Sequence, residues 1–163
     1  LVQVARDNNR LNERMHQMTL GLINTNSLQA LLDTLRENLQ GEFNADSVTL
    51  RLAGVPDAQA RECGVDTFQP NAPEVTHFET FLKSSRPQCG RFKPEQLGYL
   101  FGDQAQAIES VALIPLGDRC ACGLLAIGSQ ESSRFHPGMG TLFLTHLGEL
   151  LGLLLAEYCQ PNG

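Results

Sequence analysis

Residues 110–128 read SVALIPLGDRCACGLLAIG, and no other part of the chain has a structure that is as easy to predict. Two apolar runs flank a short polar turn at Gly117-Asp118-Arg119. Each run has the length of a strand and Gly-Asp is typical of tight turns, so the stretch predicts a β-hairpin. Neither run alternates apolar with polar residues. We therefore expect two central strands that are covered on both faces.

Length and composition bound the class of protein. The chain has 163 residues, of which 42% are hydrophobic, and a net charge of −6. It fits one domain of ordinary size plus an appendage, with enough apolar residues for a real core. An acidic chain with a pI near 5.1 does not bind nucleic acid by bulk charge. Because the sequence starts at Leu1 without a methionine, we expect a processed product or a fragment of a longer protein.

Membrane insertion and export are not expected. The first apolar run is interrupted by charged residues, so it does not resemble a signal peptide. The most apolar window, residues 142–156, contains His146 and Glu149 and is shorter than the roughly 20 residues of a membrane span. The five cysteines form no CxxC pair. We expect a cytoplasmic protein with reduced, mostly buried thiols.

The N-terminal residues follow a heptad pattern. The positions with spacing 3, 4, 3, 4, 3, 4 are Leu1, Val4, Asn8, Leu11, Met15, Met18 and Leu22. One interpretation is a parallel coiled-coil dimer in which Asn8 sits in the seam and fixes register. The other is an amphipathic helix that packs on its own domain.

The following segments predict an alternation of helices and strands. Leucines on one face indicate a helix over residues 28–39, and residues 46–53 alternate as a strand with one polar face. Residues 54–72 read as a loop with one short strand near residues 65–68. Pro73 and Pro94 begin two further helices, and the second ends at Gly102.

The last helix, residues 139–158, is apolar on nearly every side and is expected to be buried all round. One face can pack on the sheet, and the other needs residues 1–22 of the same or of a symmetry-related chain. The predicted dimer interface therefore also includes Leu151 and Leu154 on this helix, besides Val4, Asn8, Leu11, Met15, Met18 and Leu22.

The second half of the chain resembles the C-terminal half of a GAF domain. In that family a strand ends in Pro-Leu, here Pro115-Leu116, and a Gly-Leu-Leu-Ala strand follows, here residues 123–126. A linker then ends in a Phe before the last helix, here Phe135. The whole chain looks most like a bacterial GAF-like family known as domain-of-unknown-function family 484.

The resemblance implies an α+β (α/β/α) fold, with a central antiparallel sheet, helices on both sides and a pocket on one face of the sheet. The resemblance, together with the heptads of the N-terminal residues, divides the chain into a coiled-coil-type helix, residues 1–24, and a GAF-like domain, residues 25–163. It also implies dimerisation through the N- and C-terminal helices, as in many signalling proteins.

Three specialised kinds of GAF domain do not match. The cyclic-nucleotide signature Asn-Lys-Phe-Asp-Glu is absent, and no cysteine has the setting of a bilin attachment site. Methionine-sulfoxide reductases of this fold carry a cysteine shortly before the Pro-Leu strand. That place falls near Gln104, where there is none. We therefore expect no catalytic residues, no cofactor and no resident metal.

The cysteines nevertheless permit a second hypothesis. Cys120 and Cys122 are two apart and, in a strand, would share a face. With Cys89 they could bind a soft metal or an iron–sulfur cluster, or act in thiol chemistry. The alternative is that they pack as small apolar residues.

A basic segment surrounds one of these cysteines. Residues 83–93, KSSRPQCGRFK, carry four cations and no acid in an otherwise acidic chain. The cations could favour the Cys89 thiolate, and Arg91 could bind the carboxylate or phosphate of a ligand. A solvated basic loop is the alternative.

The sequence contains no known catalytic motif. The leading hypothesis is a non-enzymatic regulatory module that binds a small molecule or a protein partner and acts as a homodimer. One alternative is a thiol-dependent redox enzyme or sensor that uses Cys89 with Cys120 or Cys122. Another is a structural adaptor without a ligand.

Overall fold

The computed structural model describes residues 2–42, 45–67, 73–117, 120, 122–138 and 141–158, without the side chains of residues 2–12, 42 and 74. Its elements are α1 (Val2–Ile23), α2 (Leu28–Glu42), β1 (Ser47–Leu52), α3 (Asp57–Glu62), β2 (Asp66–Thr67), the 3-10 helix η1 (Pro73–Phe78), α4 (Glu79–Ser84), β3 (Gln88–Gly90), α5 (Pro94–Phe101), the 3-10 helix η2 (Gly102–Ala107), β4 (Ser110–Leu116), β5 (Gly123–Ser129) and α6 (Leu142–Leu155).

The predicted hairpin is confirmed as β4 and β5, and it forms the centre of the sheet. Every residue of both strands is buried. The five strands lie in the order β2-β1-β5-β4-β3. All neighbours are antiparallel except β2, which pairs with β1 in parallel over two residues. This is the α+β sheet that the sequence predicted.

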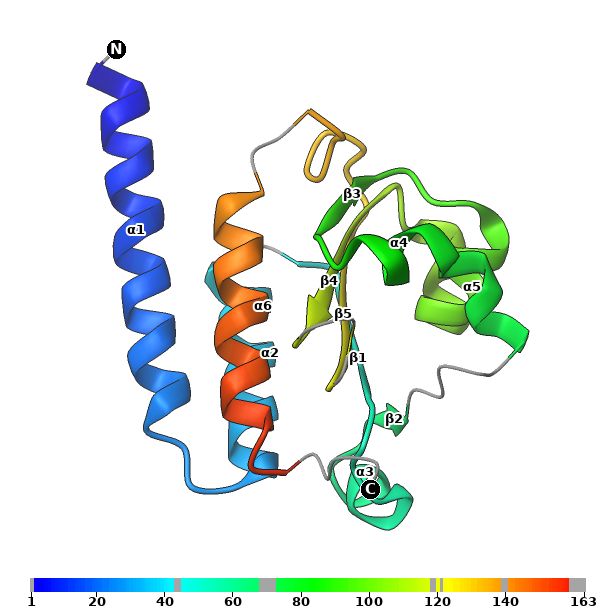
Figure 1. Cartoon of the computed structure of the whole chain (residues 1–163). Coiled ribbons are helices and arrows are strands. Elements are labelled where there is room, and N and C mark those ends of the chain that lie inside the picture. Colours follow the sequence, from blue (N-terminus) through cyan, green and yellow to red (C-terminus); the bar gives the residue numbers. More distant parts are fainter. Residues whose placement is uncertain are drawn as a thin grey trace.

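Helices cover both faces of this sheet (Figure 1). α1, α2 and α6 lie on one face, and η1, α4, α5 and η2 lie on the other. Two hydrophobic cores result, one on each side. Strand alternation divides their members: Leu50 and Leu52 of β1 and Ile114 of β4 face α2 and α6, whereas Val111 and Leu113 of β4 face α4 and α5.

The C-terminal half of α1 belongs to the core of its own chain. Met18 and Leu22 are only 1% and 0% exposed, because α1 packs on α2 and α6. The N-terminal end of α1 extends past α6 (Figure 1). At Met18 and Leu22 the structure therefore matches the second interpretation of the heptads, a helix that packs on its own domain. The side chains of Val4, Asn8 and Leu11 lie outside the described residues.

Within a single chain, α6 is buried on only part of its surface. Leu151 is buried at 1% exposed, but Leu142 and Leu153 are 70% and 75% exposed. α6 packs on β4 with one face and contacts α1 with another, where Leu154 is half-buried. A third face, which carries Leu142 and Leu153, has no covering element within the described part of the chain.

Three short elements were not predicted: α3, β3 and the 3-10 helix η2, which follows α5. The loop assigned to residues 54–72 contains α3 as well as the expected short strand, which is β2. The basic segment contains β3, which pairs with β4. Among the described residues, no helix has the length and hydropathy that a membrane span needs.

Candidate functional site

The sheet face below α4 and α5 is occupied by the protein's own side chains. Phe78 and Phe81 are each 2% exposed, and Leu100 is 3% exposed. The Phe78 and Tyr99 rings pack with their centroids 5.4 Å apart. These side chains form a continuous core with β4 and β5. The described residues therefore place a packed core at this position.

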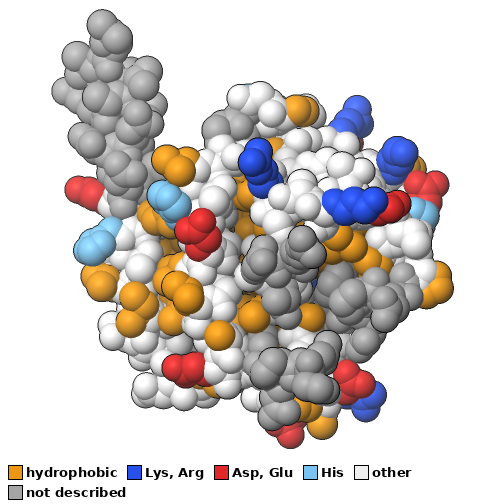
Figure 2. All heavy atoms as spheres, in the orientation of Figure 1, with side chains coloured by type: hydrophobic (Ala, Val, Ile, Leu, Met, Phe, Trp, Pro, Cys, Tyr) orange, Lys and Arg blue, Asp and Glu red, His pale blue; other side chains and the backbone are white. Residues whose placement is uncertain are grey.

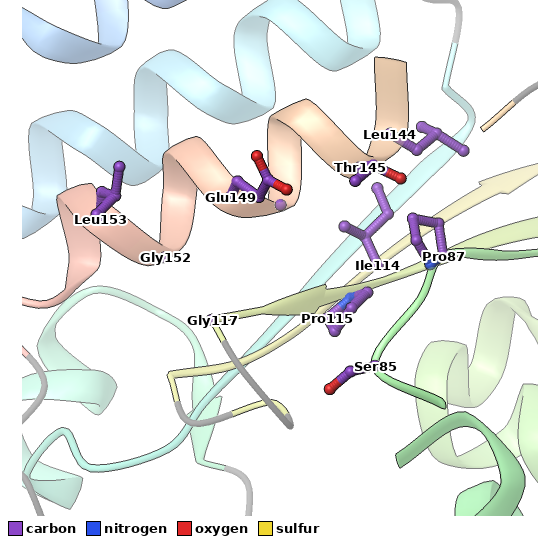
Figure 3. Close-up of a pocket in the computed structure, with 11 residues that line it drawn as sticks. Ser85, Pro87, Ile114, Pro115, Gly117, Leu144, Thr145, Glu149, Gly152 and Leu153 are labelled. Atoms are coloured by element: carbon purple, nitrogen blue, oxygen red, sulfur yellow. The ribbon is translucent and has the colours of Figure 1, made fainter. Parts of the chain in front are cut away.

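A hollow of about 570 Å³ lies instead on the opposite side of the sheet, along α6 (Figure 3). We call it the α6 groove. Its walls are α6, the C-terminal end of β4 and residues 85–87, and its lining is mostly apolar. It exists because the pairing of β3 with β4 stops at Leu113, so that Ile114 and Pro115 lie at an open sheet edge. Proline suits such an edge because it has no N–H to donate.

Two glycines of α6 form part of the wall of this groove. A Cβ at Gly148 would lie 2.6 Å from the Pro115 carbonyl oxygen, and one at Gly152 would lie 2.7 Å from the Gly117 nitrogen. α6 therefore approaches the end of β4 backbone to backbone. Larger residues at these positions would push α6 away from the hairpin.

A second cavity, of about 340 Å³, lies at the open edge of β1. We call it the β1-edge cavity. β2 pairs only with Arg51 and Leu52, so Val48, Thr49 and Leu50 pair with β5 on one side and face this cavity on the other. The start of β2, the end of α5 and Arg36 of α2 complete a mostly polar lining.

Arg51 is the main charged group of the β1-edge cavity. Its Nη2 donates a hydrogen bond of 2.7 Å to the Tyr99 carbonyl oxygen at the end of α5. Its guanidinium carbon lies 4.0 Å from the centroid of the Tyr99 ring, in a cation–π contact. Asp66 is more distant, with 3.9 Å between the charged atoms. The cavity therefore offers a fixed cation and free backbone groups, which suit a small polar ligand.

The structure separates the predicted cysteine cluster. The expectation that Cys120 and Cys122 share a face is wrong, because β5 begins only at Gly123 and Cys120 lies in the turn with φ of 59°. Cys120 packs in the core under α5, whereas Cys122 faces α6, where its Sγ lies 3.9 Å from the Gly152 carbonyl oxygen.

Cys89 lies far from both of these cysteines. It pairs with Ala112, whereas Cys122 binds Leu116 through the backbone. The two places are roughly 13 Å apart along β4, too far for a disulfide without backbone movement. The sheet separates Cys89 from Cys120, because they pack in different cores. In the part of the chain that the structure describes, no three His, Cys, Asp or Glu side chains lie close enough to hold a metal ion.

Burial makes the thiols poor nucleophiles. It raises the pKa of Cys89 from 9.0 to about 11 and that of Cys120 to about 12. The thiolate is the reactive form of cysteine, so both thiols are protonated and inert at neutral pH. The redox hypothesis required the cations of the basic segment to lower the pKa of Cys89. Burial raises this pKa instead.

The pKa of Cys89 predicts its reactivity. A rise from 9.0 to about 11 lowers the thiolate fraction at pH 8 about 100-fold. We expect iodoacetamide to modify Cys89 about 100 times more slowly in the folded chain than in urea, as measured by peptide mass spectrometry. Equal rates in the two states would contradict the burial and restore the redox hypothesis.

The basic segment is partly neutralised by neighbouring acids. Arg91 donates a hydrogen bond of 2.6 Å to Glu109, and Lys83 pairs with Glu79 at 2.9 Å. Arg91 is 76% exposed, so it lies on the surface and lines neither of the two hollows. Its role in ligand binding stays a prediction.

The sequence did not predict either hollow, because the position of each hollow depends on where a short edge strand stops.

Sheet order, the two helical layers and the hairpin define a GAF-like α+β domain. Phe135, the residue of the GAF pattern that ends the linker before α6, is buried. A family model described as "Protein of unknown function, DUF484" matches residues 1–160, and the chain belongs to this family. This match confirms the resemblance of the whole chain to domain-of-unknown-function family 484. No curated protein matches the chain.

Proposed function

We propose that the chain is a non-enzymatic regulatory module that works as a homodimer through α1 and α6 and responds to a small molecule or a protein partner. The observation that carries this proposal is the position of the exposed apolar side chains. The large hydrophobic side chains exposed among the described residues are Leu20, Ile23, Leu142 and Leu153, and all four lie on α1 and α6. Figure 2 shows hydrophobic side chains along the surface that these two helices form.

Gathered apolar side chains of this kind are typical of an interaction surface. α1 and α6 are also the helices through which the GAF resemblance implies dimerisation. Of the predicted interface residues, Met18, Leu22 and Leu151 are buried inside the chain and stabilise the two helices rather than a contact between copies. The contact would instead use the exposed residues beside them. A small-molecule effector would enter the β1-edge cavity, next to Arg51.

Native mass spectrometry of the protein purified from its own host tests both parts of the proposal. We expect the mass of two chains, with a retained small molecule or a bound partner. Leu153→Glu should give single chains, because it places a charge on the exposed apolar surface of α6. Ala58→Glu, on the exposed face of α3, is the matched control and should remain dimeric. A monomeric wild-type chain at micromolar concentration would overturn the homodimer.

A further inference from the structure

The exposed face of α6 is a single stripe of four residues: Leu142, His146, Glu149 and Leu153. Their spacing of 4, 3 and 4 places them in one line along a helix. All four are exposed, whereas the opposite face packs into the core. Figure 3 shows Glu149 and Leu153 pointing to the same side of α6, away from Pro115. We call this line the α6 stripe.

The α6 stripe has a symmetric order. Read from either end, it begins and ends with an exposed leucine and has one polar residue on each side of its midpoint. An antiparallel copy of the helix would place Leu142 opposite Leu153. It would place His146 opposite Glu149 in the same register. The stripe therefore complements the stripe of a second copy only when the two helices run antiparallel. A two-fold axis perpendicular to the helix produces this arrangement.

The two polar residues of the α6 stripe have no recorded partner within the described residues. Both are exposed, and the structure gives neither a hydrogen bond nor an ion pair there. Glu149 is the acid of a helix that otherwise consists mostly of leucine and glycine. An imidazole N–H donates to a carboxylate in either charge state of the histidine. The pair thus supplies the polar contact that an otherwise apolar interface lacks.

We infer that α6 packs antiparallel against α6 of a second copy of this chain, across a two-fold axis at the middle of the stripe. Leu142 then contacts Leu153 of the partner subunit, and His146 contacts Glu149 of the partner subunit, each pair occurring twice. This inference rests on the proposed homodimer and specifies its interface. It also places Leu142 of the partner subunit at the mouth of the α6 groove, beside Leu153.

A parallel arrangement is the alternative, and it is the one that the heptads of residues 1–22 predict. In a parallel pair each residue faces its own counterpart, so Glu149 would face Glu149 of the partner subunit. Like charges that face each other weaken a helix pair, and this disfavours the parallel register on α6. Fewer residues of α1 are available for a parallel contact than the heptads predict, because Met18 and Leu22 are buried in their own chain.

Cysteine cross-linking distinguishes the two orientations. Single variants Leu142→Cys and Leu153→Cys are prepared separately, mixed after reversible dissociation and oxidised with copper phenanthroline. In the antiparallel dimer only the mixture forms a covalent dimer, because two copies of position 142 lie roughly 16 Å apart along the helices. Peptide mass spectrometry should identify a 142–153 link. Oxidised wild-type protein controls for the native cysteines.

A pair of substitutions at one position gives an independent readout. His146→Lys should strengthen dimerisation about threefold and His146→Glu should weaken it about tenfold, because the new side chain faces a carboxylate in both cases. In a parallel dimer both variants place like charges together, and both weaken dimerisation. Ala58→Lys and Ala58→Glu, measured by sedimentation equilibrium, correct for the change in net charge.

The outcomes separate this inference from the proposed function. A 142–153 link and opposite effects of the two His146 variants support the antiparallel dimer. A 142–142 link from the single variant overturns the antiparallel orientation but leaves the homodimer intact. A monomeric wild-type chain overturns both.

Discussion

Replacement of Gly123 by alanine is expected to unfold the chain or to lower its melting temperature by more than 10 °C. Gly123 has φ of +121°, a conformation that residues with a Cβ rarely adopt. A Cβ at this position would lie 1.9 Å from the Arg51 carbonyl oxygen. The backbone strain and the steric overlap together cost about 2–6 kcal/mol, a large part of the about 5–15 kcal/mol that stabilises an ordinary domain.

Gly123 is this sensitive because it pairs with strands on both sides, opposite Leu52 of β1 and Leu116 of β4. Neither neighbour can move without breaking the sheet. Thermal unfolding followed by circular dichroism measures the effect. Gly41→Ala is the matched control, since nothing lies within 4 Å of a Cβ there and alanine favours the helix. A Gly123→Ala variant as stable as the wild type would show that the strands do not have this register.

Replacement of Phe78 by alanine should lower the free energy of unfolding by about 3–5 kcal/mol. The Phe78 side chain is 2% exposed and packs against Tyr99 in the core between the sheet and α5. The substitution removes apolar contacts and leaves a cavity against this face of the sheet. We expect this cavity to admit apolar molecules such as benzene, as other dry engineered cavities do.

Urea unfolding in the presence and absence of benzene measures both effects. Phe92→Ala is the matched control, because Phe92 packs on the same core but is only half-buried. It should cost less and should show no stabilisation by benzene. If Phe78→Ala unfolds at the urea concentration of the wild type, then this face of the sheet is an open pocket rather than a packed core.

Much of the fold could be predicted because both faces of the hairpin are buried, and such strands need apolar residues at successive positions. The apolar runs around Gly117 have no polar alternation, and only a central position in the sheet satisfies such strands. Leucines on one face of residues 28–39 likewise predicted α2. α3 and β3 were missed because each is stabilised by its neighbours rather than by its own pattern. β3 in particular has three residues and depends on β4 for its pairing.

The candidate sites could not be predicted, since they depend on where elements end. A count of residues placed Cys120 in the strand, whereas the strand begins at Gly123 and the turn takes Cys120 to the other face. The sequence also did not predict that Leu142 and Leu153 are exposed. An apolar helix predicts burial but does not indicate which of its faces is covered. Leu147 and Leu153 look alike in sequence, but Leu147 is buried in the core and Leu153 is exposed.

The close contact of α6 with β4 has a mechanical consequence. At Gly148 and Gly152 the backbone of α6 lies against the backbone of Pro115 and Gly117, so rotamer changes can absorb little of a displacement of α6. A shift of α6 caused by assembly would move the end of β4 directly, and β4 and β5 would carry that movement across the sheet to β1. α6, β4 and β5 would then move as one rigid unit, which reaches β1 next to Arg51.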